Sequence, residues 1–216
     1  MTHLDLLKSE AVKRNLLPTD GAIDPATAFA LVRDMPYLRA SDRRPETVIR
    51  EWRGTCSGKH YLLKALFAEL GLPADLMACT IIAHPDPATT HPALMAILEP
   101  VGGRFVDVHN YLVVHAPAGD MIVDATWPLE TERYGMVVNR QFRLGENQQI
   151  AYTPSETWVV PEDVDPQAFK DALLAEHFTP AELAARDQFI RVLSEGLVAT
   201  AGNESVMSKR SETSPP

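Results

Sequence analysis

The sequence has no excess of positive charge and no basic run. Its 216 residues contain 20 Lys and Arg against 29 Asp and Glu, which gives a formal net charge of −9. Nucleic acids and anionic membrane surfaces would repel such a chain, and no stripe of basic and aromatic residues offsets that repulsion. The composition therefore indicates no nucleic-acid partner and no membrane partner.

Long apolar runs are also missing. No uncharged apolar stretch approaches the ~20 residues that span a bilayer. The first residues, MTHLDLLKSEAVKRNLL, carry charges throughout, and they lack the apolar stretch and small-residue cleavage site of a signal peptide. We therefore expect a cytoplasmic protein, and the 45% hydrophobic content is ordinary for a soluble globular chain.

Cysteine is scarce, with only Cys56 and Cys79 in the chain. A single disulfide is not expected in a reducing cytoplasm, and a chain of this length has little need of one. We therefore treat both residues as free thiols and ask whether either lies where a thiolate would be stabilised.

Metal-binding motifs of defined spacing are absent as well. The sequence has no D-x-D-x-D-G calcium loop and no H-x-x-x-H pair. A metal site assembled from His84, His91, His109, His115 and a cysteine is an alternative, but no ligand spacing supports it. We expect no metal and no cofactor, and metal analysis of the purified protein would test this.

Helical patterns fill the first third of the chain. Apolar residues recur at helical spacing from Leu4, and Asp24-Pro25 has the pattern of an N-cap followed by proline, which opens a helix through Met35. The segment SGKHYLLKALFAELGLP, which follows Cys56, has a broad apolar face and ends at Gly71. We expect this last helix to be largely buried.

The middle of the chain has the two-residue period of strands, and its end returns to helix. Strands are expected at 76–82, 105–115 and 121–127, and within QQIAYTP and ETWVV. Helices are expected over 166–178 and from Thr179 to about Leu197. This order predicts an α+β fold in one domain, residues 1–199, with a core at 36–160, C-terminal helices at 166–199 and a disordered tail at 200–216.

Cys56 lies directly before the strongest helix pattern. The unpaired N–H groups and the positive dipole end at a helix start favour a thiolate, and the same groups can stabilise an oxyanion. Gly54 lets the chain turn sharply and lets a substrate backbone approach. A small apolar residue packed at a helix start explains this position equally well. Cys79, inside an apolar strand, is expected to be inert core.

The predicted hairpin FVDVHNYLVVH–APAGD–MIVDATW could supply a base and a group that orients it. With a four-residue loop, His115 pairs with Asp120 and Tyr111 faces Asp124, so that His109 lies one diagonal step from Asp124 on the same face. A three- or five-residue loop without a bulge would put the two side chains on opposite faces. The placement is therefore conditional on the loop.

Other histidines compete for the role of base. His115 would lie at the mouth of the hairpin and is expected at the surface. His60 shares a helix face with Cys56, but it has no carboxylate partner that the sequence shows, so we expect a supporting or structural role. His109 taken alone would more often be structural, and its assignment depends on its joint placement with Asp124 and Cys56.

These residues resemble the transglutaminase-like superfamily. GTC followed by SGKHYLLKALFAELGLPADLMACTI resembles its nucleophile region, and DVHNYLVV followed by DMIVDATWP resembles its histidine strand and Asp-x-Thr strand. The variant GTCSGKH, with HNYL and VDATWP, is particularly similar to small bacterial single-domain members. The resemblance covers residues 36–128 in ordered blocks.

The resemblance implies a papain-like α+β fold, the transglutaminase core, in which the nucleophile helix packs on a central antiparallel sheet. It implies a catalytic triad with Cys56 as the nucleophile, His109 as the base and then the acid, and Asp124 as the orienter. The implied reaction is cysteine-dependent acyl transfer through a thioester acyl-enzyme. The substrate would be an amide or thioester, with peptides among the candidates, and the enzyme an amidase or peptidase, or a transamidase.

Some features depart from the relatives of this superfamily. Larger transglutaminases have an upstream tryptophan, but Trp52 is only four residues before Cys56. Arylamine acetyltransferases carry an Arg-Gly-Gly lead into the cysteine, where this chain has Trp-Arg-Gly-Thr. The residues expected to bind substrate are Trp52, Gly54, Thr55 and Tyr111.

Two expectations concern function beyond the triad. A non-catalytic binding module on the same fold is the alternative to an enzyme, and reactivity of Cys56 toward iodoacetamide would separate the two. The segment 84–104, rich in proline and histidine, is expected to form a substrate-facing loop. The sequence does not indicate the oligomeric state.

Overall fold

The computed structural model describes residues 1–211, and for residues 200–211 it describes the backbone only. Four helices precede the sheet. These helices are α1 (His3–Lys13), α2 (Pro25–Arg33), α3 (Pro45–Glu51) and α4 (Cys56–Glu69). The predicted N-cap is confirmed, since the Asp24 side chain accepts a hydrogen bond from Thr27 N and Pro25 begins α2. The helix ends at Arg33, two residues before the expected Met35.

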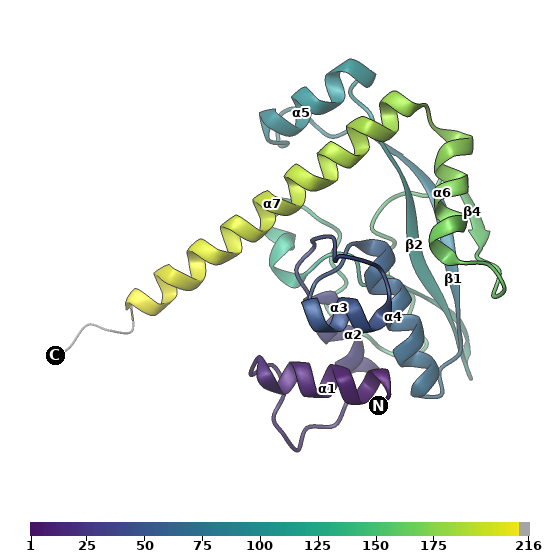
Figure 1. The fold of residues 1–216 in the computed structure, drawn as a ribbon, viewed down its shortest axis with the longest axis vertical. Helices are drawn as coiled ribbons and strands as arrows, with labels where there is room; N and C mark the ends of the chain where they lie inside the picture. Colours follow the sequence, from purple (N-terminus) through teal and green to yellow (C-terminus); the bar gives the residue numbers. More distant parts are fainter. Residues whose placement is uncertain (212–216) are drawn as a thin grey trace.

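The central sheet has four antiparallel strands in the order β3-β2-β1-β4 (Figure 1). The strands are β1 (Ala74–Ala83), β2 (Phe105–Ala116), β3 (Gly119–Val123) and β4 (Glu156–Val159). The predicted α+β class is therefore confirmed. Helix α4 packs against β1 and β2, and its apolar residues are buried as expected.

Both faces of β2 are covered. Its even-numbered apolar residues, from Val106 to Val114, lie in a core cluster with side chains of α1 to α4 and α6. Its odd-numbered residues Phe105 and Tyr111 lie in a second cluster with residues of α5 and α7. Asp107 and His109, on the odd-numbered face of β2, are therefore shielded from water.

Two sequence-based assignments are wrong. QQIAYTP forms no strand, because its backbone N–H groups bond to acceptors outside a strand ladder. The N–H of Gln148 donates to Ile122 O, and that of Ala151 donates to the Asp124 carboxylate. Strand β3 ends at Val123 instead of near 127, and the Gln148 side chain accepts the N–H of Asp124.

The segment 84–104 was expected to be a loop, but part of it is helical. It holds α5 (Pro92–Leu98) and the short 3-10 helix η1 (Glu99–Val101). Buried Leu94 and Leu98 lie in the second cluster, and α5 packs on α7. Proline at the first position of α5 accounts for the helix start in this proline-rich stretch. Its contact with substrate stays a prediction.

The chain ends in two helices, α6 (Pro166–His177) and α7 (Pro180–Ser211), after the 3-10 helix η2 (Leu129–Tyr134). Helix α7 crosses the molecule, and its last part extends away from the other elements (Figure 1). It runs past the expected end near Leu197. The expected disordered tail at 200–216 therefore overlaps α7, and its residues 212–216 lie outside the described residues. Within the described chain, no helix has the length and apolar character to cross a membrane.

Candidate active site

Cys56 is the first residue of α4 and is only 3% exposed. Thr55 is the N-cap in extended conformation, but its side chain makes no capping hydrogen bond. The N–H groups of Cys56 and Ser57 have no acceptor among the described residues. The start of α4 therefore keeps unpaired donors and a positive dipole end beside the thiol.

The hairpin has the register that the sequence predicted. His115 pairs with Asp120, and Leu112 pairs with Val123, the last residue of β3, so Asp124 comes directly after the paired part of the hairpin. The loop has two residues instead of four, because Ala116 and Gly119 also pair. An even loop length keeps the same faces together.

His109 and Asp124 form a buried pair on this face. The distance from His109 Nε2 to Asp124 Oδ2 is 2.8 Å, and both side chains are at most 1% exposed. Asp124 also accepts the N–H of Thr126 on Oδ1 and the N–H of Ala151 on Oδ2. Although burial alone would raise the pKa of Asp124, the interaction with His109 and these further contacts hold it well below its usual range. Asp124 is therefore a charged carboxylate that fixes the imidazole.

The second nitrogen of His109, Nδ1, has no partner at hydrogen-bond geometry among the described residues. The Cys56 thiol interacts with the imidazole as well as Asp124. Burial alone would lower the pKa of His109, but Asp124 and Cys56 together raise it to about 10. The ring is therefore protonated at neutral pH, with Nε2–H donated to Asp124 and Nδ1 available to the sulfur.

Lys170 of α6 supplies a second positive charge at the thiol. Its Nζ lies 3.8 Å from Cys56 Sγ and donates to Ser57 Oγ at 3.1 Å. Burial alone would raise the pKa of Cys56, but Lys170 and His109 lower it to about 6. A thiol with this pKa is mostly thiolate at neutral pH, which is the nucleophilic form.

The sequence interpretation missed Lys170, which is 114 residues from Cys56. One signal could have indicated it: Lys170 lies three and four residues before Leu173 and Leu174, on the buried face of α6. A lysine on an apolar helix face is rare without a partner.

Asp107 links both C-terminal helices to the site. It lies two residues before His109 on β2, and its Oδ1 accepts from Arg186 Nε of α7 at 2.6 Å. The same oxygen lies 3.5 Å from Lys170 Nζ. Burial alone would raise the pKa of Asp107, but Arg186 and Lys170 lower it. Helices α6 and α7 therefore set the charge around the thiol as well as completing the core.

His60 has the supporting position that the sequence suggested. Its Nδ1 lies 2.8 Å from Cys56 O, and its Nε2 accepts the N–H of Ala125 at 2.9 Å. Burial lowers the pKa of His60 to about 4, so the ring is neutral. It ties the start of α4 to the segment after Asp124, whose Oδ1 lies 3.7 Å from Nε2.

Cys79 and His115 lie in surroundings different from those of Cys56 and His109. Cys79 is fully buried in β1, and burial raises the pKa of its thiol to about 12. This is the inert environment that the strand position predicted. His115 lies next to the turn of the hairpin, partly exposed, beside Asp120 and Asp75.

The expected substrate-binding residues lie in different surroundings. Gly54 and Thr55 line a cavity of about 210 Å³ beside α4, and the Tyr111 ring is stacked with that of His109 at 6.4 Å. Trp52 ends α3 in left-handed conformation, and the Arg14 guanidinium of α1 lies 4.9 Å from its ring. Contact of these four residues with substrate stays a prediction.

Replacing Lys170 with methionine is expected to raise the pKa of Cys56 by at least one unit. Alkylation by iodoacetamide needs the thiolate, so the wild-type rate rises as the pH passes about 6. Below that pH, a variant whose thiol pKa is one unit higher reacts about tenfold more slowly. The two proteins should react equally above pH 9.5 or so, where both are ionised. The measurement is the pH profile of the labelling rate.

Lys64→Met is the matched control, because Lys64 is a lysine of α4 that pairs with Glu162 and not with the thiol. Asp107 keeps Arg186 in the Lys170 variant, so no carboxylate is left unpaired. An unchanged pH midpoint in Lys170→Met would contradict the role assigned to this lysine.

Neither a family model, nor a curated protein, nor a solved structure matches this chain. Among the described residues, no three His, Cys, Asp or Glu side chains gather as a metal site would require. The interpretation of the site therefore depends on the buried arrangement of Cys56, His109 and Asp124, with Lys170 beside the sulfur.

Proposed function

We propose that the chain is a transglutaminase-like cysteine enzyme with a papain-like core, which transfers an acyl group from an amide or a thioester through a thioester on Cys56. The observation that carries the proposal is the 2.8 Å contact of His109 with Asp124, on an imidazole whose other nitrogen is left for the thiol at the start of α4. A nucleophile, a base and a group that orients the base are the components of acyl transfer by a cysteine.

The first half of the reaction forms the acyl-enzyme. The Cys56 thiolate attacks the carbonyl carbon, a C–S bond forms, and the carbonyl π electrons move to the oxygen. The unpaired N–H of Cys56 lies where such an oxyanion can be stabilised. As the intermediate collapses, the C–N bond of the amide or the C–S bond of the thioester breaks, and His109 gives its Nδ1 proton to the leaving group.

The second half releases the acyl group. Neutral His109 accepts a proton on Nδ1 from water or from an amine, and the oxygen or nitrogen attacks the thioester carbon. The bond from that carbon to Sγ breaks and restores the thiolate beside the imidazolium. Asp124 holds Nε2–H throughout and stabilises the positive ring. Water as acceptor gives hydrolysis, and an amine gives transamidation.

A non-catalytic binding module is the second candidate, and one observation favours it. Cys56 is 3% exposed and His109 is fully buried, so a substrate reaches the sulfur only after neighbouring side chains move. Tyr37 and Tyr152, whose phenols interact with the Cys56 charge, are among those neighbours. A module that does not turn over would keep the thiol closed to reagents.

Incubation of the native protein with generic acyl thioesters and activated amides is expected to give a single acyl adduct on Cys56. The low pKa of this thiol makes it the more reactive of the two cysteines. Intact-protein mass spectrometry measures the adduct, and peptide mapping assigns it. Adducts on Cys79, or none in the folded protein at neutral pH, would favour the binding module.

A further inference from the structure

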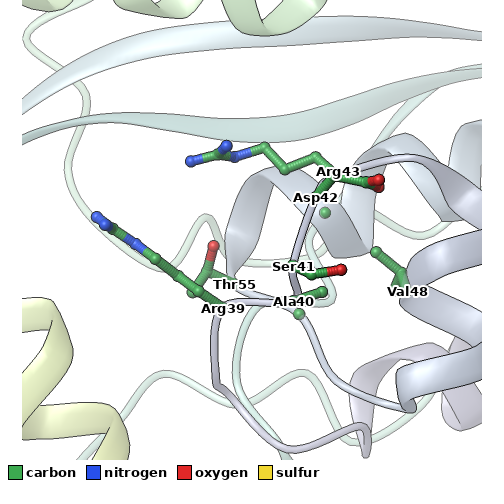
Figure 2. Close-up of a pocket in the computed structure, with 9 residues that line it drawn as sticks. Arg39, Ala40, Ser41, Asp42, Arg43, Val48 and Thr55 are labelled. Carbon is green, nitrogen blue, oxygen red and sulfur yellow. The ribbon is translucent and has the colours of Figure 1, made fainter.

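A small cavity of about 210 Å³ lies directly beside the nucleophile's helix (Figure 2). Its lining includes the N-cap Thr55, one residue before Cys56, and Gly58 of α4, two residues after it, with Arg39, Asp42 and Arg43 from the segment between α2 and α3. Thr55 immediately precedes Cys56. Cys56 itself does not line the cavity and is 3% exposed, so a molecule held there would reach the thiol once the side chains that cover the sulfur move.

Arg43 carries a positive charge that nothing described in the chain neutralises. Its side chain is half-buried, and it has no ion pair and no hydrogen-bond acceptor among the described residues. The carboxylate nearest in sequence, Asp42, is occupied by Arg44, whose Nη2 lies 2.7 Å from Oδ2. Hydrogen bonds from Arg44 lower the pKa of Asp42 to about 2, so Asp42 is ionised and its charge is paired with Arg44. A partly buried, unpaired arginine favours an anionic ligand.

Arg39 adds to this positive charge. Its Nη2 pairs with Asp187 at 2.7 Å, but the same Asp187 oxygen also accepts from Arg186 at 2.7 Å. One carboxylate is thus shared by two guanidinium groups. Figure 2 shows Arg39 and Arg43 extending in the same direction past Thr55. The Thr55 hydroxyl makes no capping bond and is free to donate.

We propose that this cavity binds a carboxylate carried by the acyl substrate of Cys56. The inference rests on the proposed function and adds the substrate's charge to it. An arginine fork matches the two oxygens of a carboxylate, and the cavity is smaller than the ~300 Å³ at which sites for drug-sized ligands begin. Its size fits a carboxylate on a stem of a few carbon atoms.

The test compares alkylating probes that differ only in charge. Chloroacetyl-glycine and chloroacetyl-β-alanine are each paired with their primary amide, and the Cys56 sulfur displaces chloride as the C–S bond forms and the C–Cl bond breaks. We expect at least one carboxylate probe to label Cys56 about tenfold faster than its amide, relative to the same ratio for free cysteine, which is the size of one charge-assisted hydrogen bond. The measurement is the second-order labelling rate by mass spectrometry.

Arg43→Gln should remove most of this preference and leave the rate with the amide probes unchanged. Arg43→Lys keeps the charge but loses the fork and should retain part of the preference. Arg50→Gln is the matched control, since Arg50 is an exposed arginine of α3 that does not line the cavity; it should behave as the wild type. Thermal melts of the three variants check that the fold is kept.

The outcomes separate the two proposals. Labelling of Cys56 with no carboxylate preference, or with a preference that Arg43→Gln leaves intact, overturns the carboxylate site alone. Failure of every probe to label Cys56 overturns the proposed nucleophile and the carboxylate site with it. A preference that depends on Arg43 and not on Arg50 supports both.

Discussion

Replacing Cys56 with alanine is expected to abolish the acyl adduct and to lower turnover by about 10⁴-fold or more, the scale of removing a nucleophile from a catalytic triad. The other cysteine cannot take its place, because Cys79 lies in β1 with a thiol pKa of about 12. The adduct is measured by intact mass and turnover by release of the leaving group.

The fold should survive this change. Lys170 loses only its 3.8 Å contact with the sulfur, and it keeps Ser57 Oγ and the nearby Asp107 carboxylate. Cys79→Ala is the matched control: it leaves a small void in the sheet but should acylate at the wild-type rate. Turnover that persists in Cys56→Ala, with a normal melting temperature in the same sample, would refute the nucleophile.

The second large effect is expected for Asp124→Asn, with kcat lowered by about 10³- to 10⁴-fold, the range seen when the orienting carboxylate of a triad is made neutral. An asparagine amide that donates to His109 Nε2 leaves the proton on Nδ1, so the nitrogen facing the sulfur can no longer accept one. The loss of the carboxylate also lowers the pKa of His109, since Asp124 is the main group that raises it.

Stability changes in this variant as well. Asp124 accepts the N–H groups of Thr126 and Ala151 besides His109, and an amide cannot satisfy all three with one oxygen. The melting temperature should therefore fall, and kcat has to be measured well below it. Asp120→Asn is the control, because Asp120 lies on the same hairpin with an exposed side chain that pairs with His115 and not with His109. Equal kcat values for the two variants would refute the orienting role.

Much of the site could be predicted from the sequence because its parts are local. A cysteine before an apolar helix fixes the thiol at a helix start, and strand alternation brings His109 to the face of Asp124 once the loop length is even. The loop was two residues instead of four, but the parity, and not the length, decides which side chains meet.

The missed parts depend on contacts between segments far apart in the chain. Lys170 and Arg186 reach the site only when α6 and α7 pack on β2, and no local pattern states where a distant helix docks. QQIAYTP was assigned as a strand from its composition, but the side chain of Asp124 takes the N–H of Ala151. A tertiary hydrogen bond overrode a weak propensity there.

The long separation between Cys56 and Lys170 has a consequence for synthesis. A ribosome makes the N-terminal end first, so the cysteine emerges more than a hundred residues before the lysine that lowers its pKa. Until α6 docks, the nascent thiol lacks that cation and keeps a pKa nearer to that of free cysteine. During translation the Cys56 thiol is therefore largely protonated, and a protonated thiol resists oxidation. It becomes largely ionised only when the last helices have packed on the sheet.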